Sequence, residues 1–497
     1  MAKTITSSKR ERLSSVDTAW LRMDRPSNLM IICGVLVLRE RVAIDRLRNT
    51  LEQRFLRFER FRQRAVQGAG GAYWQDGERF DLRHHLQRAT LPGRAGKTEL
   101  EAFVSALASK PLDPARPMWQ FHLVERYEAG SAIIVRIHHS YADGIALIQV
   151  MLSLTDADRA GNIAGPAPLP PDAPDDAPAG SFDSQLIGQL SGPLSGALKV
   201  AMKTGSRLIE KGVGLWHDPA QAVALAGQGQ ALTAEIVKLV TMGEDSHTRF
   251  KGRPGVAKRV AWADPVPLAD VKAIGRAYDC SINDVLLSAV AGAIRSYLLS
   301  HGDGVDGASL RALVPVNLRP PEKAHTLGNR FGLVFLDLPL GIANPVERLY
   351  AVRANMRALK GSYQPLLSLG ILAAMGAGPK VLQEELLALL AKNATAVMTN
   401  VPGPQQPLFI AGAKIDAMMF WVPQSGDIGI GVSILSYDGK VQFGVIADRG
   451  LCPDPDRLID RFAPEFDKLV VATLLSPWPW ERPPTGSEVE QAVFGGS

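Results

Sequence analysis

Cysteine is scarce in this chain of 497 residues, which has only Cys33, Cys280 and Cys452. Their wide spacing and odd number provide neither a disulfide framework nor a Cys-x-x-Cys metal pair. This pattern fits a reducing, cytosolic compartment, and each thiol is expected to be a small buried apolar side chain.

The sequence also lacks a secretory signal, a clear membrane span and a nucleic-acid-binding pattern. No apolar core follows the charges of residues 1–15. The uncharged run 361–379 approaches the length of a span, but Pro365 and several glycines favour a buried segment. The net charge of +5 suits an anionic cosubstrate or a membrane surface, whereas no cluster of Lys and Arg interleaved with aromatic residues is present. We therefore expect a cytoplasmic protein with no nucleic-acid partner.

The length of the chain exceeds what one hydrophobic core usually supports, so we expect two domains. Strand and helix patterns alternate in both halves, which predicts an α/β architecture of mixed sheets flanked by helices. A proline-rich stretch, 165–180, cannot be regular structure and marks a linker. The predicted units are an N-terminal domain (1–160), a linker with a long helical crossover (161–255) and a C-terminal domain (256–497). Within the first unit, residues 44–64 have the amphipathic pattern of one helix.

Four basic residues of the crossover recur at intervals of four: Lys199, Lys203, Arg207 and Lys211. On a helix they would form one slowly drifting stripe opposite apolar side chains. Such a stripe is typical of proteins that rest on anionic lipid, and it is also compatible with an ordinary solvated helix face.

Two adjacent histidines stand out because the chain has only nine. His138 and His139 end an apolar stretch, 131–140, that predicts a β-strand. Side chains alternate along a strand, so His139 would continue the apolar row that ends with Ile137, where burial keeps its imidazole neutral near pH 7. His138 would face the other way, which disfavours a shared zinc ion because metal ligands must converge. A general base, a buried structural histidine and a metal ligand all remain open from the residues alone.

Asp143 and Gly144 follow the histidines at the predicted start of a helix. An Asp at this position is a typical N-cap, and the Gly would supply a tight turn.

Residues 138–144 match the His-His-x-x-x-Asp-Gly signature shared by CoA-dependent acyltransferases and by peptide-synthetase condensation domains. The rest of the chain resembles the bacterial wax ester synthase/acyl-CoA:diacylglycerol acyltransferase family. The similar segments are 14–34, a Pro-Leu-Trp-like motif with Met118 in place of leucine (111–125), an Asn-Asp motif (282–295), and the C-terminal motifs 314–319, 327–332 and 399–404. They are spread over almost the whole chain, so the resemblance is specific. The Asp-Phe-Gly-Trp-Gly signature of plant-type acyltransferases is absent.

The resemblance implies a two-domain fold like that of chloramphenicol acetyltransferase, with the active site in a tunnel between the domains. His139 would be the general base that takes the proton of an alcohol hydroxyl as its oxygen attacks the thioester of acyl-CoA. His138 and Gly144 belong to the same motif, and Asp143 would be chiefly structural. Asn283, from the Asn-Asp motif, would donate to the developing oxyanion or else cap its helix. Gly328 and Asn329 are expected to shape the backbone.

The expected function is transfer of a long-chain acyl group to diacylglycerol or to a long-chain alcohol. Acyl-CoA is the cosubstrate, and neither a cofactor nor a metal is assigned. The enzyme would associate peripherally with the inner face of the membrane or with lipid inclusions. The alternative is a condensation-type amide- or ester-forming domain, or a non-catalytic lipid-binding member of the same superfold.

Overall fold

The computed structural model describes residues 11–68, 71–76, 80–159, 242–318, 329, 331–360, 362, 364–377, 383, 392–424, 426–476 and 488. The predicted crossover therefore lies largely outside the described residues, and so do Gly328 and the basic stripe Lys199, Lys203, Arg207 and Lys211. The described end of the crossover, 242–255, contains no helix.

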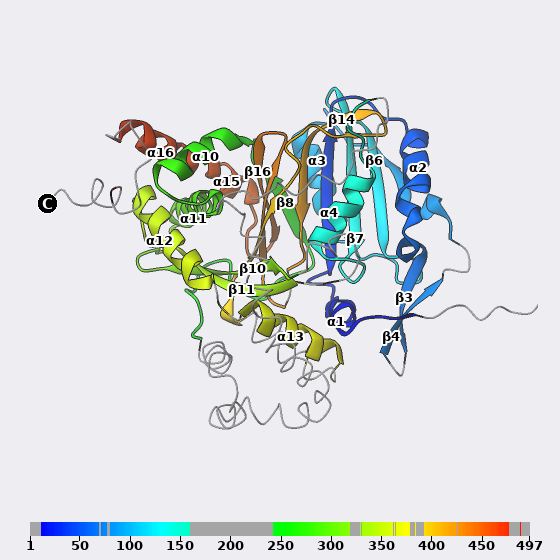
Figure 1. The fold of residues 1–497 in the computed structure, drawn as a ribbon, viewed down its shortest axis with the longest axis horizontal. Helices are drawn as coiled ribbons and strands as arrows, with labels where there is room; N and C mark the ends of the chain where they lie inside the picture. Colours follow the sequence, from blue (N-terminus) through cyan, green and yellow to red (C-terminus); the bar gives the residue numbers. More distant parts are fainter. Residues whose placement is uncertain are drawn as a thin grey trace, which may run out of the picture.

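A mixed six-stranded sheet forms the first half of the molecule (Figure 1). Its strands, in spatial order, are β13 (Phe409–Ile410), β14 (Ala413–Trp421), β2 (Ile31–Leu38), β7 (Gly130–His138), β6 (Trp119–Tyr127) and β5 (Leu86–Ala89). Only β5 and β6 run parallel. A smaller sheet of β1 (Glu11–Arg12), β4 (Gly71–Asp76) and β3 (Gln63–Gly68) lies beside it.

Helices cover both faces of this first sheet. Apolar side chains of α2 (Ile44–Gln53) and α4 (Gly144–Ser153) pack with Ile133, Val135 and Ile137 of β7. Helix α3 (Lys97–Ala108) packs on the opposite face, with Ala132 and Ile134. The alternation predicted for this strand is thus confirmed, because successive residues of β7 belong to two different core clusters.

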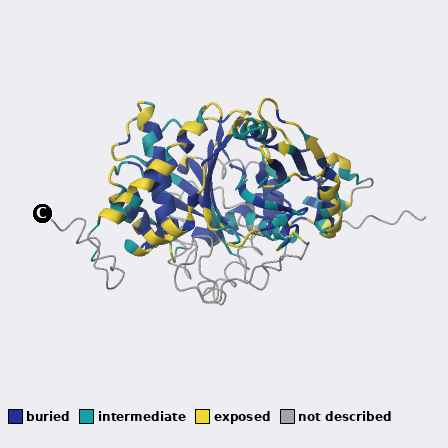
Figure 2. Cartoon of the chain, turned by 90° about the horizontal axis from the view of Figure 1, so that it is seen from above, coloured by how far each residue is buried: buried dark blue, intermediate teal, exposed yellow. Residues whose placement is uncertain are grey.

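A second, seven-stranded mixed sheet forms the other half (Figure 1). Its order is β11 (Phe331–Pro339), β10 (Ser309–Asn317), β12 (Ala396–Pro402), β15 (Ile430–Tyr437), β16 (Lys440–Asp448) and β8 (Lys258–Trp262), with β9 (Val266–Pro267) also paired to β16. One face carries a layer of α10 (Leu268–Ala277), α11 (Ile282–Ser300), α12 (Pro345–Leu359), α15 (Pro455–Ile459) and α16 (Phe462–Leu475). Buried residues fill both halves, and exposed ones lie on the outer helices and the connecting loops (Figure 2).

The two halves exchange structural elements. Strands β13 and β14 come from the C-terminal part of the sequence but complete the first sheet. In return, α3 of the first half lies along β8, the edge strand of the second sheet. The α/β architecture of two mixed sheets flanked by helices is the one predicted from the sequence.

The apolar run 361–379 contains α13 (Gln364–Ala377), which packs between α1 (Ser15–Met23) and β11, where Leu372 and Met375 are buried. The prediction of a buried segment is therefore confirmed for this helix. Among the described helices, only α11 has the length and apolar composition of a membrane span, and 78% of its apolar window is buried inside the fold. Such burial is typical of a core helix.

The single helix predicted over 44–64 is wrong beyond its first half. Helix α2 ends at Gln53, short 3₁₀ turns follow at Phe55–Arg57 and Glu59–Arg62, and the chain then enters β3. Phe55 and Phe61, both fully buried, stack with ring centroids 4.1 Å apart. Burying both rings in the same core bends the chain away from a continuous helix.

Candidate active site

The two histidines lie where β7 ends, between two segments of the first half. His138 N donates to Met118 O at 2.9 Å, and His139 N donates to Met30 O at 2.7 Å. Tyr141 strengthens the same junction, since its hydroxyl accepts from Met118 N at 3.0 Å and donates to Gln63 O at 2.7 Å. The Pro-Met-Trp segment around Met118 therefore holds the main chain of the histidine loop.

His139 is enclosed by aromatic rings. Only 3% of its surface is exposed, its imidazole stacks on Trp20 at 4.0 Å with an interplanar angle of 18°, and Phe331 lies 5.7 Å away. Burial lowers the pKa of His139 to about 4, although its own carbonyl and the Asn329 side chain oppose this effect. The imidazole is thus neutral near pH 7, as predicted.

The expected surroundings of His139 need a correction. Strand β7 ends at His138, so the alternation of side chains does not extend to His139. Trp20 and Phe331 belong to a different apolar cluster from Ile137. The ring therefore faces helix α1 and strand β11, not the apolar row of its own strand.

His138 has a different set of contacts. Its Nδ1 accepts from the Ser140 hydroxyl at 2.8 Å and from Ser140 N at 3.2 Å, which places the proton of the neutral ring on Nε2. This Nε2 lies 3.9 Å from Asp24 Oδ2, and burial lowers the pKa of His138 to about 3. No group of three His, Cys, Asp or Glu side chains that could hold a metal ion occurs in the described part of the chain.

Asp143 is the N-cap of α4, because its Oδ1 accepts from Ala146 N at 2.8 Å. The predicted capping role is confirmed. The predicted tight turn at Gly144 is not, since Gly144 is the first residue of the helix and its φ lies outside the left-handed region. No described atom lies within 4 Å of a Cβ built there. The absent side chain leaves free space at the start of α4, next to the histidine loop.

Asn283 lies on the other half of the molecule and does not cap its helix. Ser281 is the N-cap of α11, in a capping box with Asp284. Asn283 is buried in the first turn, and its Oδ1 accepts from Asn400 Nδ2 at the end of β12. The Asn-Asp motif and the C-terminal motif 399–404 therefore meet, while no hydrogen bond among the described residues joins Asn283 to His139.

Three residues beside His139 were not predicted as part of the site: Asp17, Trp20 and Asn329. Asn329 Nδ2 donates to Asp17 Oδ1 at 2.7 Å and to His139 O at 2.9 Å. All three residues are buried, and they come from the segments 14–34 and 327–332, which the sequence marks only as family motifs. Asn329 was expected to shape the backbone, and its side chain instead links two segments.

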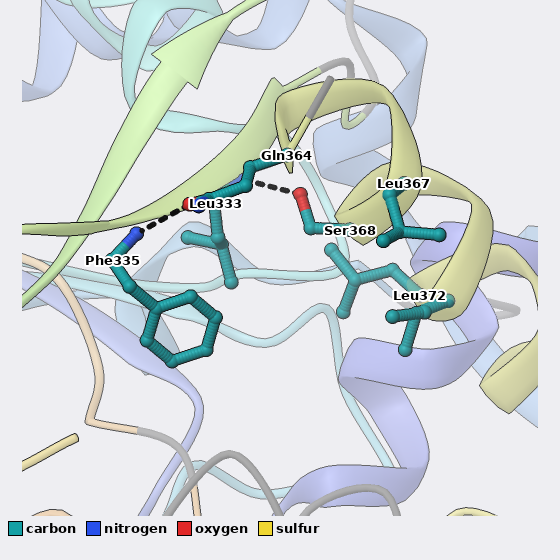
Figure 3. A pocket seen from close by; sticks show the side chains of 7 residues that line it. Leu333, Phe335, Gln364, Leu367, Ser368 and Leu372 are labelled. Carbon is teal, nitrogen blue, oxygen red and sulfur yellow. Dashed lines mark hydrogen bonds between the residues drawn. The ribbon is translucent and has the colours of Figure 1, made fainter. Parts of the chain in front are cut away.

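An apolar cluster continues from this point along β11. A small cavity of about 10 Å³ lies between β11 and α13, lined by Leu333, Phe335, Gln364, Leu367, Ser368, Ile371 and Leu372 (Figure 3). Leu333, Phe335 and Leu372 belong to the same cluster as Trp20, which stacks on His139. The base candidate thus lies at the border of an apolar region.

Comparison with known proteins identifies the family. The wax ester synthase/diacylglycerol acyltransferase catalytic domain matches residues 13–286, and the WS/DGAT C-terminal domain matches residues 327–470. The chain belongs to this family. A probable diacylglycerol O-acyltransferase of Mycobacterium tuberculosis is 27% identical over 467 residues, covering 90% of this chain and 93% of the relative. A putative diacylglycerol O-acyltransferase of Mycobacterium bovis is 29% identical over 417 residues, covering 82% of this chain and 79% of the relative.

Solved structures show the same fold. The wax ester synthase/diacylglycerol acyltransferase of Marinobacter aquaeolei VT8 superposes with a TM-score of 0.65 at 22% identity, covering 94% of this chain and all of that one. The starter condensation domain of rhizomide synthetase, in complex with C8-CoA and Leu-SNAC, gives a TM-score of 0.56 at 13% identity over 95% of this chain and 96% of that one. The fold is thus common to WS/DGAT enzymes and condensation domains, and the family match distinguishes between them.

Proposed function

We propose that this protein is an acyl-CoA-dependent O-acyltransferase that acylates diacylglycerol or a long-chain alcohol, with His139 as the general base. The observation that carries the proposal is a buried, neutral imidazole in the His-His-x-x-x-Asp-Gly loop of a WS/DGAT family member. The alternative, a condensation-type or non-catalytic member of the superfold, is not favoured by the family match.

The chemistry follows from the protonation state of His139. A neutral imidazole accepts the proton of the acceptor hydroxyl while the oxygen attacks the thioester carbonyl. When the tetrahedral intermediate collapses, the carbon–sulfur bond breaks, and the imidazolium returns the proton to the CoA thiolate. No covalent acyl-enzyme is needed. Asn283, on the other half of the molecule, is the proposed donor to the developing oxyanion.

The surroundings of His139 suit apolar substrates. Trp20 and Phe331 border the ring and continue into the apolar cluster of β11 and α13. An alkyl chain in contact with such side chains is stabilised by roughly 0.8 kcal/mol for each buried CH₂.

The test is an acceptor panel with radiolabelled long-chain acyl-CoA and diacylglycerol, a long-chain alcohol or an amine. We expect ester formation by the wild type and a loss of about 10²–10⁴-fold for His139→Ala. His84→Ala, which alters an exposed histidine on a 3₁₀ turn, is the matched control and should keep full activity. Preferential acylation of the amine would support the condensation-type alternative. Unchanged activity of His139→Ala would rule out the proposed base.

The lipid acceptor implies contact with a membrane or a lipid inclusion, and the proposed contact is peripheral, from the cytoplasmic side. The basic residues Lys199, Lys203, Arg207 and Lys211 are the proposed attachment to anionic lipid, each contributing about 1 kcal/mol near the surface. Sedimentation with liposomes should require anionic lipid, weaken as salt rises, and fall when all four residues are changed to Gln. Binding that ignores both salt and these substitutions would contradict this part of the proposal.

A further inference from the structure

The side chain of Asn329 bridges helix α1 and the histidine loop. Its Nδ2 donates to the Asp17 carboxylate at 2.7 Å and to the main-chain oxygen of His139 at 2.9 Å. An amide nitrogen has two protons, so both are used. The three residues expose 7% of their surface or less, and the bridge is therefore shielded from water.

Two polar atoms beside this bridge have no hydrogen-bond partner among the described residues. They are Asn329 Oδ1 and His139 Nδ1. A buried polar atom without a partner costs about 1–3 kcal/mol, so two on residues already joined by a hydrogen bond need an explanation. Their chemistry is complementary, since a carboxamide oxygen only accepts and Nδ1 donates whenever it carries a proton.

We propose that Asn329, anchored by Asp17, is a positioning residue for His139. Through Nδ2 it fixes the main chain of the base, and through Oδ1 it accepts the Nδ1 proton of the imidazolium, so that Nε2 is the nitrogen that exchanges a proton with the substrates. The inference rests on the proposed role of His139 as the base.

The charges around His139 agree with this arrangement. Among the described residues, the titratable groups of the loop and its surroundings include His138, Tyr141 and Asp143 of the loop itself, Asp24 next to His138, and Asp17 across Asn329. Burial lowers the pKa of His139, whereas its own main-chain carbonyl and, next to it, the Asn329 side chain oppose this shift. Burial also raises the pKa of Asp17, whereas the hydrogen bond from Asn329 lowers it. Asn329 thus favours the charged form of both neighbours, which is what proton uptake by His139 requires.

A purely structural role would give a different result, because Asn329 would then only tie α1 to the loop. Asn355 supplies the comparison, since its Nδ2 donates to the main-chain oxygen of Asp337 at 2.7 Å. It is an asparagine that anchors a strand carbonyl without contacting the histidine loop. Loss of either amide would lower the melting temperature, but only loss of Asn329 would change the titration of the base.

The experiment compares Asn329→Ala, the exchange variant Asp17→Asn/Asn329→Asp, Asn355→Ala and His139→Ala in the full-length protein. For Asn329→Ala we expect kcat to fall at least about tenfold with KM for acyl-CoA nearly unchanged. The precedent is the orienting Asp of serine proteases, whose replacement by Asn costs about 10⁴-fold. The acid limb of the kcat/KM profile should move to lower pH, because a group that raises the pKa of His139 is lost. In the exchange variant, which keeps one amide and one carboxylate in the bridge, the negative charge that now lies next to His139 should move this limb to higher pH. Asn355→Ala should lower only the melting temperature.

The outcomes separate this inference from the proposed function. If His139→Ala is inactive while neither Asn329 variant shifts the acid limb in its stated direction, the positioning role is overturned and the base remains. If His139→Ala keeps its activity, the base itself is wrong. Should Asn329→Ala fail to fold, the opposite shift in the exchange variant still decides the question.

Discussion

His139 shows what a sequence can and cannot reveal about a site. The prediction of a buried, neutral imidazole at His139 is confirmed, although the strand alternation on which it rested ends at His138, and the N-cap predicted at Asp143 is confirmed as well. The motif 138–144 could not indicate Trp20 or Asn329, because these residues reach His139 only through tertiary packing. The N-cap alternative for Asn283 was wrong for a local reason. Ser281 is also a good capping residue and is the N-cap, so Asn283 lies inside the first turn of the helix.

The stacking of Trp20 on His139 leads to a prediction at the scale of one ring. Phe at position 20 keeps an aromatic face, whereas Leu fills part of the volume without one. Aromatic pairing is worth about 0.5–1.5 kcal/mol beyond burial, so Trp20→Leu should lose up to about tenfold more kcat than Trp20→Phe. The indole Nε1 is buried without a partner in the described structure, so its loss in Trp20→Phe carries no hydrogen-bond penalty. Steady-state kinetics on both variants checks this, and equal kcat values would contradict an orienting role for the ring.

The cap at Asp143 leads to a second prediction. Asp143→Asn keeps an acceptor for Ala146 N and should cost roughly 1 kcal/mol or less, while Asp143→Ala should cost about 0.5–2 kcal/mol and also reduce activity. Asn344→Ala is the matched control, because Asn344 caps α12 through Val346 N. It should lower stability by a similar amount and leave activity intact. Thermal melting and turnover assays measure the two effects. An Asp143→Ala variant with unchanged stability and no activity would argue for a direct catalytic role.

At the scale of elements, helices satisfy the free edges of the second sheet. On β11, Leu333 N donates to Ser368 Oγ at 2.5 Å and Phe335 N donates to Gln364 Oε1 at 3.0 Å, so α13 replaces a missing strand (Figure 3). On β8, the amides of Lys258, Val260 and Trp262 donate to Ser109, Ser105 and Glu101 of α3. On both edges, acceptors that lie four residues apart on a helix thus accept hydrogen bonds from the amides of every second residue of the strand. Neither set of hydrogen bonds was predicted from the sequence, because the spacing of donors and acceptors has a meaning only when the helix is known to lie along the edge strand.

Gly332 shows how closely α13 approaches its strand. A Cβ at this position would lie 2.0 Å from Pro365 O, which is backbone and cannot rotate away. Gly332→Ala should therefore displace α13 and destabilise the protein by several times the roughly 1 kcal/mol typical of a point mutation. Gly370→Ala, within α13 and with no described atom within 4 Å of the new Cβ, should be neutral or stabilising by about 0.5–1 kcal/mol. Denaturant unfolding measures both, and equal stabilities would show that the close contact carries no energetic weight.

At the scale of the whole molecule, the two halves are joined by exchange. The sequence indicated two α/β units from the alternation of elements, but the pairing of β14 with β2 connects residues almost 400 positions apart. Strand partners are chosen by tertiary packing and not by local pattern. The cluster beneath α3 likewise combines Val104, Ile134, Val260, Trp421 and Ile446, which come from both halves. The connection is therefore a shared hydrophobic core reinforced by the hydrogen bonds between α3 and β8.

Glu101 makes this connection sensitive to pH. Burial raises the pKa of Glu101 to about 7 from its ordinary value of 4.5, although Trp262 N–H and Lys97 oppose the shift. Between about pH 4.5 and 7 the folded protein therefore holds a proton that the unfolded chain has released. The contribution of Glu101 to stability is fully present below about pH 4.5, is lost as pH rises towards 7, and is constant above that value. At pH 8 a half-buried carboxylate thus lies where α3 of the first half meets β8 of the second, and it costs stability.

Glu101→Gln removes the charge and keeps an oxygen that can accept from Trp262 N. We expect this variant to melt at a higher temperature than the wild type at pH 8, with the difference shrinking to nothing near pH 4.5. Ser105→Ala is the control, because it removes the neighbouring acceptor of Val260 N without removing a titratable group. It should lower the melting temperature by the same amount at both pH values. A Glu101→Gln variant that is less stable than the wild type at pH 8 would contradict this prediction. It would show that the hydrogen bond from Trp262 N to the carboxylate outweighs the cost of burying the charge.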